Sequence, residues 1–292
     1  MTSGGLPDPR RHAYREDIAA ETLRGVVEAE RYVKGEPRQV SAPSLPLRRE
    51  PRFDATLDTE AFFGETVTLY DESEGWAWVQ LDRDGYVGYM PSEGLSPKLS
   101  NPTHRIAALR TYVYSEPDAK TPPLSLLSLN ARVTVTRAEG KFLALAGGGY
   151  VFAGHVAPIG EAEPDFVAVA EAFIGTPYLW GGRTSIGLDC SGLVQLAVEA
   201  AGYAAPRDAD MQAAELGNLV AWKSSELRRG DLVFWEGHVG IMTSGKEFLH
   251  ANVFHMAVEI EPFAEAKRRI KAVGYEVICV RRLPRRRRVT RG

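Results

Sequence analysis

The feature that most constrains the fold is a change of hydrophobic pattern along the chain. From about residue 42 to residue 159, apolar and polar side chains alternate in short runs separated by glycine-containing turns, which is typical of small antiparallel β-domains. After Ile159, helical spacing appears first and alternating runs return later. A chain of 292 residues accommodates about two domains, or three if some are small. The pattern predicts β-domains followed by an α+β domain.

The β-rich part contains two rounds of strands. In the first, residues 66–70, 76–81 and 86–90 alternate with period two, and Asp84-Gly85 supplies a tight turn. The second round has runs at 110–114, 131–135, 141–145 and 149–152. The turn-and-strand order G-W-x-x-V…G-Y-V-G-Y of the first round is echoed in the second, and both resemble bacterial SH3-like domains. Trp76 and Trp78 are expected in the core of the first.

The N-terminal part has a different pattern. Apolar spacings of 4, 3, 3 and 4 over residues 14–33 predict an amphipathic helix. Its apolar face would consist of Ala19, Leu23, Val26, Ala29 and Val33. Residues 1–13, rich in glycine, proline and arginine, are expected to be mobile, and the proline-punctuated segment 35–51 to be a linker.

Charge is distributed unevenly along the chain. The formal net charge is −3, but residues 281–292 carry seven arginines and no acid, so residues 1–280 carry a net −10. The overall balance gives no reason to expect a nucleic-acid or membrane partner. The arginine-rich tail is expected to be a solvated end, with docking on an anionic polymer as the alternative.

Neither a membrane span nor a secretory signal is expected from the sequence. No run approaches the ~18 apolar residues of a membrane helix, and the first residues contain no apolar h-region. These absences predict a cytoplasmic location. The only cysteines, Cys190 and Cys279, are 89 positions apart, which excludes a disulfide framework, and both are expected as thiols.

Cys190 is the candidate nucleophile. It stands between a glycine-rich loop and a predicted helix over 191–201. The positive end of the helix dipole and the unpaired backbone N–H groups at that point favour thiolate over thiol. The alternative is a small buried apolar side chain. Cys279 lies in the apolar run 277–280 and is expected to be a core residue.

Two histidines could serve such a cysteine. A cysteine nucleophile needs a base for its proton and a group that holds the base in one tautomer. His238 begins one alternating run and His250 ends the next, with a turn at Ser244-Gly245 between them. An antiparallel hairpin would place both side chains on one face. Each histidine alone could be structural, but together with Cys190 they form a candidate triad.

A metal site is the competing interpretation. Cys190, His238, His250 and His255 could supply four zinc ligands. Their spacings lack the short C-x₂-C or H-x₃-H pairs of structural zinc sites, and the sequence has no H-E-x-x-H. We therefore expect neither a metal nor another cofactor. Ser191 lacks the G-x-S-x-G elbow of serine hydrolases and is not expected to be a nucleophile.

Several ordered motifs resemble the NlpC-type cell-wall cysteine peptidases. They are GTPYLWGG at 175–182, DCSGLV at 189–194, PRD at 206–208 with Gln212, RGDLVFW at 229–235, GHVGI at 237–241, and His250. The resemblance covers residues from about 160 to 283, and the preceding SH3-like pair resembles the multidomain murein-peptide endopeptidases of that family. It implies an α+β papain-like catalytic domain preceded by two small all-β SH3-like barrels.

The expected domains follow from these patterns. They are residues 1–41 (mobile N-terminus and amphipathic helix), 42–100 (first SH3-like domain), 101–160 (second SH3-like domain), 161–283 (cysteine peptidase domain) and 284–292 (arginine-rich tail).

The resemblance also implies roles for individual residues. Cys190 would be the nucleophile, His238 the base and then the acid, and His250 the polar third member. Tyr178 would lie beside the oxyanion hole, with the Cys190 N–H as the second donor; its alternative is packing under Trp180.

A second group of residues would bind substrate. Asp189 and Ser191, with Arg207 from the matching motif, would line a subsite for a free amine, although Asp189 is also suited to cap a helix. In multidomain relatives the first SH3-like domain contributes an acidic or tyrosyl contact to the substrate amine. Glu74 and Tyr89 are the candidates for that contact here.

The implied substrate is a peptidoglycan stem peptide with a free N-terminal L-alanine. Hydrolysis would fall between γ-D-glutamate and meso-diaminopimelate or L-lysine, in the recycling of murein peptides. An amidase or acyl transferase could use the same cysteine and histidines, and a non-catalytic cell-wall-binding scaffold is the alternative from another class. The sequence carries no signal for oligomeric state.

Overall fold

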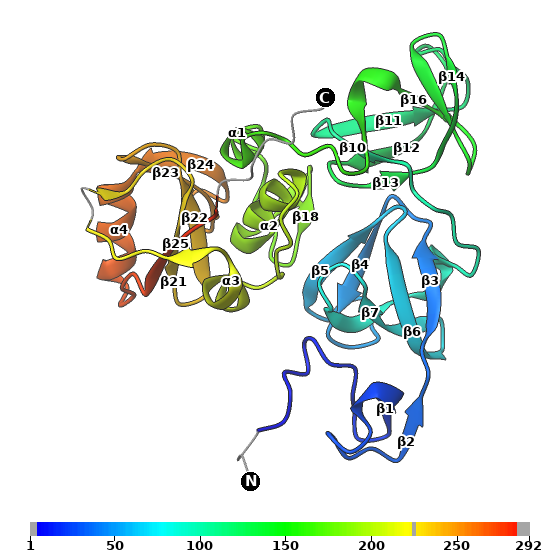
Figure 1. Cartoon of the computed structure of the whole chain (residues 1–292), viewed down its shortest axis with the longest axis horizontal. Coiled ribbons are helices and arrows are strands. Elements are labelled where there is room, and N and C mark those ends of the chain that lie inside the picture. The colour runs from blue at the N-terminus through cyan, green and yellow to red at the C-terminus, as the bar shows by residue number, and fades with distance from the viewer. Residues whose placement is uncertain (1–4, 224–225, 285–292) are drawn as a thin grey trace. The chain divides into compact units, whose positions relative to one another are not determined.

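The computed structural model describes residues 5–223 and 226–284. This part of the chain divides into two compact units (Figure 1). The β unit comprises residues up to Glu161 together with Trp180–Ser185, and the mixed unit comprises Ala162–Leu179 and the residues from Ile186 onward. The predicted arginine-rich tail lies almost wholly outside the described residues.

The first part of the β unit is an antiparallel sheet in the order β5-β4-β8-β7-β6-β3-β9. Its strands are β3 (Glu36–Val40), β4 (Ser44–Arg48), β5 (Leu57–Phe62), β6 (Thr66–Ser73), β7 (Trp76–Leu81), β8 (Val87–Pro91) and β9 (Leu95–Ser96), with a 3-10 turn at Ser92–Gly94. The predicted strands 66–70, 76–81 and 86–90 are confirmed as β6, β7 and β8. Trp76 and Trp78 are buried, as predicted.

The predicted N-terminal helix is wrong. Residues 14–33 instead form β1 (Ile18–Ala20), a 3-10 turn (Glu21–Leu23) and β2 (Arg31–Val33), with β1 and β2 paired in parallel. Ile18 and Ala20 pack with Ala13 on Trp78, whereas Val26, on the predicted apolar face, is 58% exposed. Burial against a tryptophan from β7 outweighs a local spacing that suits a helix.

The N-terminal segment and the predicted linker are also ordered parts of this unit. The carbonyl oxygens of Arg10 and Arg11 accept hydrogen bonds from Val87 N and Gln80 Nε2. Segment 35–51, predicted as a linker, contains β3 and β4. Pro46 is tolerated in β4 because the pairing of that strand with β8 is limited to Arg48.

The second part of the β unit contains the sheets β12-β11-β16-β15-β14 and β13-β10-β17. Its strands are β10 (His104–Ile106), β11 (Arg110–Tyr114), β12 (Pro123–Ser128), β13 (Arg132–Val133), β14 (Val135–Glu139), β15 (Phe142–Leu145), β16 (Tyr150–Phe152) and β17 (Val156–Pro158), with a 3-10 turn at Ala153–His155. The second-round runs are confirmed, except that 131–135 divides between β13 and β14, and β12 had no predicted counterpart.

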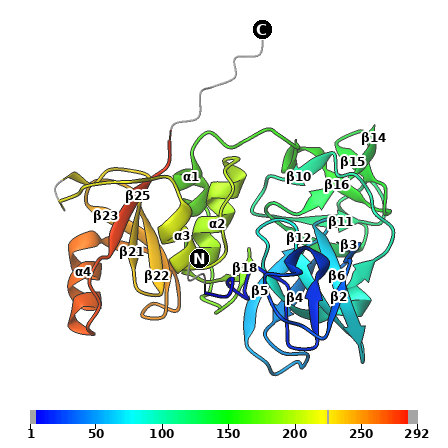
Figure 2. The same cartoon turned by 60° about the horizontal axis from the view of Figure 1, so that its bottom comes forward.

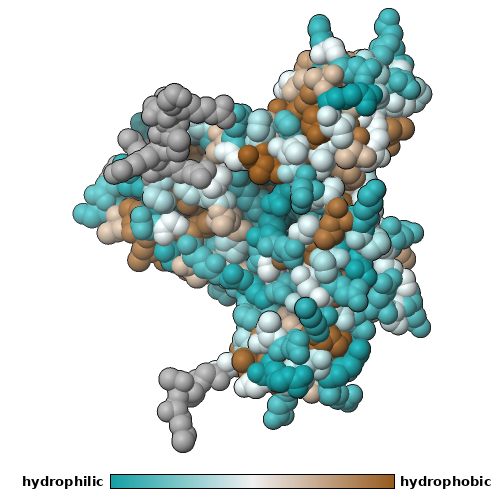
Figure 3. Space-filling model, turned by 45° about the vertical axis from the view of Figure 1, so that its right-hand side comes forward, coloured by the Kyte–Doolittle hydropathy of each residue, from teal (hydrophilic) through white to brown (hydrophobic). Residues whose placement is uncertain are grey.

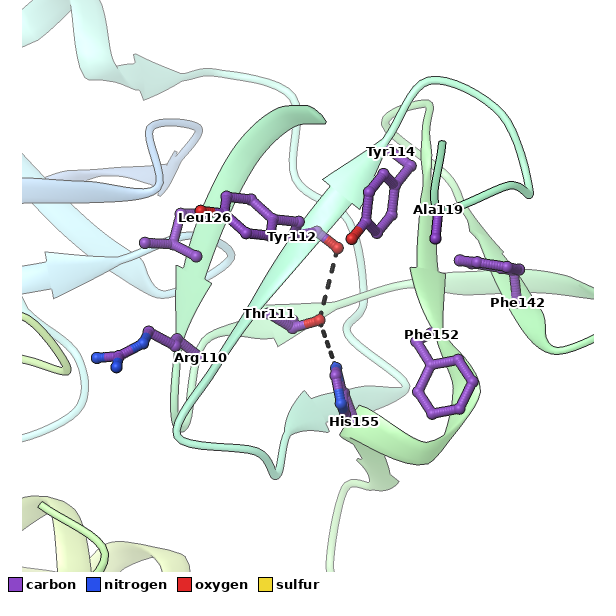
Figure 4. A pocket seen from close by; sticks show the side chains of 9 residues that line it. All are labelled: Arg110, Thr111, Tyr112, Tyr114, Ala119, Leu126, Phe142, Phe152 and His155. Atoms are coloured by element: carbon purple, nitrogen blue, oxygen red, sulfur yellow. Dashed lines mark hydrogen bonds between the residues drawn. The ribbon is translucent and has the colours of Figure 1, made fainter. Parts of the chain in front are cut away.

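Aromatic side chains gather on this second part. Figure 4 shows Tyr112, Tyr114, Phe142, Phe152 and His155 among the residues that line a cavity of about 250 Å³. Neighbouring rings make edge contacts, with 6.0 Å between the Tyr114 and Phe142 centroids. Figure 3 shows brown, apolar atoms among teal ones toward the top of the view, over this part of the chain.

The loop Trp180–Ser185 belongs to the β unit although it lies in the sequence between Tyr178 and Cys190. Arg183 is fully buried; its Nη1 donates to the Glu60 carbonyl and to Glu65 Oε1, both at 3.1 Å. Its guanidinium lies 4.1 Å from the centre of the Phe62 ring. Although burial opposes ionisation, Arg183 and Arg83 hold the pKa of Glu65 below its usual value. A buried, charge-compensated pair therefore anchors the loop.

Other contacts hold both ends of this loop. Gly181 has φ +74°, and a Cβ there would lie 2.2 Å from the Leu57 carbonyl oxygen, so only glycine fits. Ser185 N donates to Ser128 Oγ at 3.2 Å, and Arg110 Nη1 donates to the Ser185 carbonyl at 2.9 Å. The loop thus contacts strands from both parts of the β unit.

The mixed unit is built on an antiparallel sheet in the order β20-β25-β21-β22-β23-β24. Its elements are α1 (Phe166–Glu171), β19 (Gly187–Leu188), α2 (Cys190–Ala200), α3 (Ala209–Glu215), β20 (Asn218–Leu219), β21 (Asp231–Trp235), β22 (His238–Met242), β23 (Glu247–Asn252), β24 (Ala257–Pro262), α4 (Phe263–Ala272) and β25 (Cys279–Arg282); β18 (Arg183–Thr184) lies in the anchored loop. The predicted order of helices first and antiparallel strands afterwards is confirmed.

Helices cover both faces of this sheet. Figure 2 shows α4 on one side and α1, α2 and α3 on the other. Phe263 and Ala266 of α4 pack on Trp235 and Phe248, while α2 contacts β22 and β23. Alternation along each strand therefore supplies apolar side chains to two cores. In the part of the chain that the structure covers, every helix is too short or too polar to span a bilayer.

The loop anchor generates a prediction for stability. Replacing Arg183 with methionine leaves Glu65 buried without its partner in the loop, although Arg83 Nε still lies 3.3 Å from Glu65 Oε1. Removing one member of a buried pair is strongly destabilising, so we expect the free energy of unfolding to fall by about 3 kcal/mol. Urea unfolding followed by tryptophan fluorescence measures this free energy.

The control is Arg52→Met, which removes exposed ion pairs with Glu50 and Asp54 and should change the urea midpoint little. Equal effects of the two substitutions would contradict the anchor.

Candidate active site

Cys190 is the first residue of α2, and the residue before it caps that helix. Asp189 Oδ1 accepts the Gly192 N–H at 2.8 Å, which satisfies one of the backbone donors that a helix start leaves unpaired. The Cys190 side chain is only 7% exposed. The cap thus places a buried thiol where the first helical N–H groups remain available.

Asp189 is paired with a buried arginine. Arg207 Nη1 and Nη2 donate to its two carboxylate oxygens at 2.9 and 2.7 Å, and Nη1 also donates to Ser191 Oγ at 2.8 Å. Gln212 Nε2 donates to the Ser191 carbonyl at 2.9 Å. The predicted residues Asp189, Ser191 and Arg207 are therefore brought together. Arg207 is the charge partner of Asp189 in this structure, and contact of Asp189 with a substrate amine stays a prediction.

The Cys190 thiol lies against the backbone at the start of β22. Sγ is 4.0 Å from the Gly237 carbonyl oxygen, and in the described part of the chain it makes no hydrogen bond to His238. Burial and, to a lesser extent, the Asp189 charge raise the pKa of the thiol to about 12, although the Val239 N–H and Arg207 oppose the shift. The sequence-based expectation of a stabilised thiolate is wrong for this state, because desolvation outweighs the helix terminus.

His238 and His250 are brought together as predicted. In the register of β22 with β23, Ile241 faces Leu249, so Gly240 lies opposite His250 and His238 lies diagonally from it on the same face. His238 Nε2 and His250 Nδ1 are 2.8 Å apart. A Cβ at position 240 would lie 2.8 Å from His250 Cβ and 2.3 Å from Phe248 Cζ. Glycine there gives the histidines room to meet.

Sequence reasoning missed Glu261 and Arg269. Glu261 Oε1 lies 2.7 Å from His250 Nε2, and its other oxygen accepts from Arg269 Nη1 at 2.6 Å. Arg269 Nη2 also donates to Oε1. The alternation in Ala257–Pro262 places both of its glutamates on one face, opposite Val258 and Ile260, which suits a solvated face, so no local signal marked Glu261 as buried.

Burial keeps the histidines neutral. Burial, together with the smaller effects of His250 and Arg269, lowers the pKa of His238 to about 3, although Glu261 opposes the shift. Burial likewise lowers the pKa of His250 against the opposing effect of Glu261. Although burial disfavours its charge, hydrogen bonds from Arg269 and His250 hold the pKa of Glu261 below its ordinary value. The resting site thus holds a neutral thiol, neutral imidazoles and a paired carboxylate.

Tyr178 lies close enough to Cys190 for their charges to interact. Burial raises the pKa of its hydroxyl, and Cys190 and Asp189 raise it further, so the hydroxyl remains a donor. Its backbone N–H donates to the Met256 carbonyl at 2.9 Å. This bond ties Tyr178 to the turn between β23 and β24.

Glu74 and Tyr89 lie in the β unit. Glu74 occupies the exposed turn between β6 and β7, with φ +51°. Tyr89 Oη accepts from Arg15 Nη1 at 2.9 Å, and Arg15 also binds Asp71 at 2.8 Å. Tyr89 therefore has a structural partner, and contact of either residue with substrate remains a prediction.

Neither the metal alternative nor the second cysteine adds to the site. Among the residues that the structure describes, no group of three or more His, Cys, Asp and Glu side chains is arranged to hold a metal ion. Both cysteines are free thiols. Cys279, predicted to be a core residue, is only partly buried, because β25 pairs with β21 on one side and with the short β20 on the other.

Comparisons with known proteins point to one family. The protein-family model described as "Bacterial dipeptidyl-peptidase Sh3 domain" matches residues 47–95, and the one described as "NlpC/P60 family" matches residues 175–275. The gamma-D-glutamyl-L-lysine dipeptidyl-peptidase of Bacillus subtilis is 30% identical over 236 residues, which cover 73% of this chain and 78% of that protein. The protein of the same name from Bacillus cereus is 26% identical over 238 residues, or 70% of each chain.

A solved structure shows the same fold. The crystal structure of an NlpC/P60 family protein from Bacillus cereus aligns with a TM-score of 0.70 at 22% identity, over 85% of this chain and all of that one.

The raised pKa of Cys190 predicts slow alkylation at rest. With a pKa of about 12, little thiolate is present near pH 7, so iodoacetamide should label Cys190 more slowly than free cysteine. The rate should rise between about pH 7 and pH 9. A Cys279→Ser background isolates Cys190, and Cys190→Ser reports labelling of Cys279. Fast labelling that does not change between about pH 6 and pH 8 would instead indicate a preformed thiolate-imidazolium pair.

Proposed function

The chain belongs to the NlpC/P60 family and is a cysteine peptidase, and from this we propose that it hydrolyses the γ-D-glutamyl–L-diamino-acid bond of peptidoglycan stem peptides. The diamino acid would be meso-diaminopimelate or L-lysine, and the substrate would carry a free N-terminal L-alanine. The observation that carries the proposal is the likeness to gamma-D-glutamyl-L-lysine dipeptidyl-peptidase through both the SH3-like and the NlpC/P60 regions.

The proposed reaction starts from the neutral resting site. Cys190 Sγ attacks the carbonyl carbon of the γ-glutamyl amide while its proton passes to His238. His238 then gives that proton to the amine nitrogen of the diamino acid as the C–N bond breaks, leaving a thioester on Cys190. Water attacks the thioester, gives its proton to His238 and releases the dipeptide, and the proton returns to the thiol.

Two donors would stabilise the tetrahedral oxyanion. One is the backbone N–H of Cys190, at the start of α2. The other is the Tyr178 hydroxyl, which stays protonated because burial raises its pKa. Fixed donors in a buried site need no reorganisation as charge develops on the oxygen.

A bound substrate has to bring the thiol and His238 into contact. Sγ is turned toward the Gly237 carbonyl at rest, and catalytic hydrogen bonds are often loose until substrate binds. We propose that the substrate carbonyl displaces this contact, so that the proton transfer and the attack occur together.

The finer fold assignments belong to the proposal as well. We propose that residues 101–160 form a second SH3-like domain, supported by the echo of the first-round strand order in β11, β15 and β16. A papain-like arrangement is supported by a cysteine at the start of a helix that packs on the strands carrying both histidines.

A role in murein peptide recycling in the cytoplasm is also proposed. Stem peptides with a free L-alanine arise only after the peptide has been released from the glycan, so this substrate belongs to turnover rather than to the intact wall. Cell fractionation tests the location directly, since recovery of the chain with the cell wall would contradict it.

The first test is product identification. The protein is incubated with L-Ala-γ-D-Glu-L-Lys and with the meso-diaminopimelate peptide, and L-Ala-γ-D-Glu is sought by mass spectrometry. Cys190→Ala should abolish product, whereas Cys279→Ala should leave the rate near that of the wild type. Equal losses would remove Cys190 as the nucleophile. Products joined to an added amine, without hydrolysis, would indicate an acyl transferase.

The second test concerns the free amine. N-acetylation of the L-alanine removes the ammonium and adds bulk, so we expect kcat/KM to fall by on the order of tenfold to a hundredfold. The expected loss is moderate because Arg207 already neutralises Asp189 through two hydrogen bonds of 2.9 and 2.7 Å. Equal kcat/KM for the free and acetylated peptides would show that the enzyme does not select a free N-terminus.

A further inference from the structure

A carboxylate ends the chain of hydrogen bonds that begins at His238. In the register of β23 with β24, Phe248 faces Glu261 and His250 faces Glu259. Glu261 therefore lies diagonally from His250 on the same face, as His250 does from His238. The contacts run from His238 Nε2 to His250 Nδ1 at 2.8 Å and from His250 Nε2 to Glu261 Oε1 at 2.7 Å.

This chain of contacts determines which ring nitrogens carry protons. An ionised carboxylate only accepts hydrogen bonds, so His250 Nε2 has to be the protonated nitrogen. In a neutral ring, His250 Nδ1 is then an acceptor, and His238 Nε2 has to donate to it. His238 Nδ1 is left unprotonated, and it is the nitrogen able to accept the Cys190 proton.

Arg269 holds the carboxylate in this arrangement. Its Nη1 donates to Glu261 Oε2 at 2.6 Å and its Nη2 donates to Oε1. Arg269 extends from α4, and its guanidinium also lies 4.1 Å from the centre of the Phe254 ring. His255 Nε2, at 3.7 Å from Oε1, is beyond hydrogen-bonding distance. Because Arg269 compensates the charge of Glu261, the pair orients the His250 ring but adds little electrostatic potential at the two histidines.

We propose that Glu261, held by Arg269, is a positioning residue that sets the tautomers of both histidines and leaves His238 Nδ1 as the base. The residue acts through His250 and need not touch substrate. The assignment of tautomers is independent of the proposed function, and only its effect on turnover rests on that function.

Two substitutions at Glu261 test the proposal. In Glu261→Gln, the amide oxygen can take the place of Oε1, where it accepts from both His250 Nε2 and Arg269 Nη2, so both rings keep their tautomers and kcat should fall by less than about tenfold. Glu261→Leu removes the acceptor, so His250 Nε2 has no partner and the proton of His238 is no longer held on Nε2. Because the base then spends much of its time in the wrong tautomer, kcat of Glu261→Leu should fall by on the order of 10² to 10⁴ with little change in KM.

A substitution of the arginine separates positioning from structural support. In Arg269→Leu, Glu261 keeps its carboxylate and still accepts from His250 Nε2, so both rings keep their tautomers. We expect kcat of Arg269→Leu to exceed that of Glu261→Leu by about tenfold or more. A merely structural role for the pair predicts equal losses, because either substitution breaks the contact between Glu261 and Arg269.

The matched control is Asp231→Asn. Asp231 is buried in β21 of the same sheet and is held by Arg282 at 2.6 and 2.8 Å. The two arginines, Arg282 and Arg269, have equally exposed side chains, at 26%. Asp231→Asn should lower stability while leaving kcat and the histidine tautomers unchanged.

Nitrogen-15 NMR of histidine-labelled protein reads the tautomers without any substrate. We expect protonated Nε2 on His238 and His250 in the wild type, in Glu261→Gln and in Arg269→Leu, and a mixture of tautomers in Glu261→Leu. Unchanged tautomers in Glu261→Leu, or an Arg269→Leu variant as inactive as Glu261→Leu, would overturn the proposal. If the peptide assay fails in the wild type while the NMR result holds, the substrate assignment is wrong and the positioning role stands.

Discussion

The pairing of β22 with β23 is the constraint on which the candidate site depends. Side chains alternate between the faces of a strand, so a slip of one residue would send His238 and His250 to opposite faces. In the observed register Gly240 lies opposite His250, and the missing side chain leaves space for the two rings to approach. The next pairing, β23 with β24, continues the diagonal to Glu261. The register of the sheet therefore determines the hydrogen-bond chain.

Burial determines the protonation states of the cysteine and the histidines in the resting site. A helix start favours a thiolate, and this is all that a local sequence can indicate. In the folded unit the thiol is 7% exposed and lies near the Asp189 carboxylate, so its pKa rises to about 12. The same desolvation keeps His238 neutral. Proton transfer is then deferred until substrate arrives, which makes the tautomer of His238 important and gives Glu261 its proposed role.

The loop Trp180–Ser185 illustrates how a buried charge can override sequence continuity. Its position between Tyr178 and Cys190 favours membership of the last domain, yet Arg183 is buried beside Glu65 within the β unit. A buried guanidinium has to find a carboxylate and hydrogen-bond acceptors, and Glu60, Glu65 and the Phe62 ring supply them. Nothing in the spacing of residues around Arg183 indicates which distant carboxylate will be its partner.

Sequence alone determined the features that depend on local periodicity and motif spacing: the strands β6, β7 and β8, the helix start at Cys190 and the hairpin that unites His238 with His250. The tertiary structure alone decided the N-terminal strands, because Ile18 and Ala20 pack on the distant Trp78. It also decided the pairing of Asp189 with Arg207 and of Glu261 with Arg269. A side chain's partner and its desolvation depend on what the whole unit packs around it, which no local pattern records.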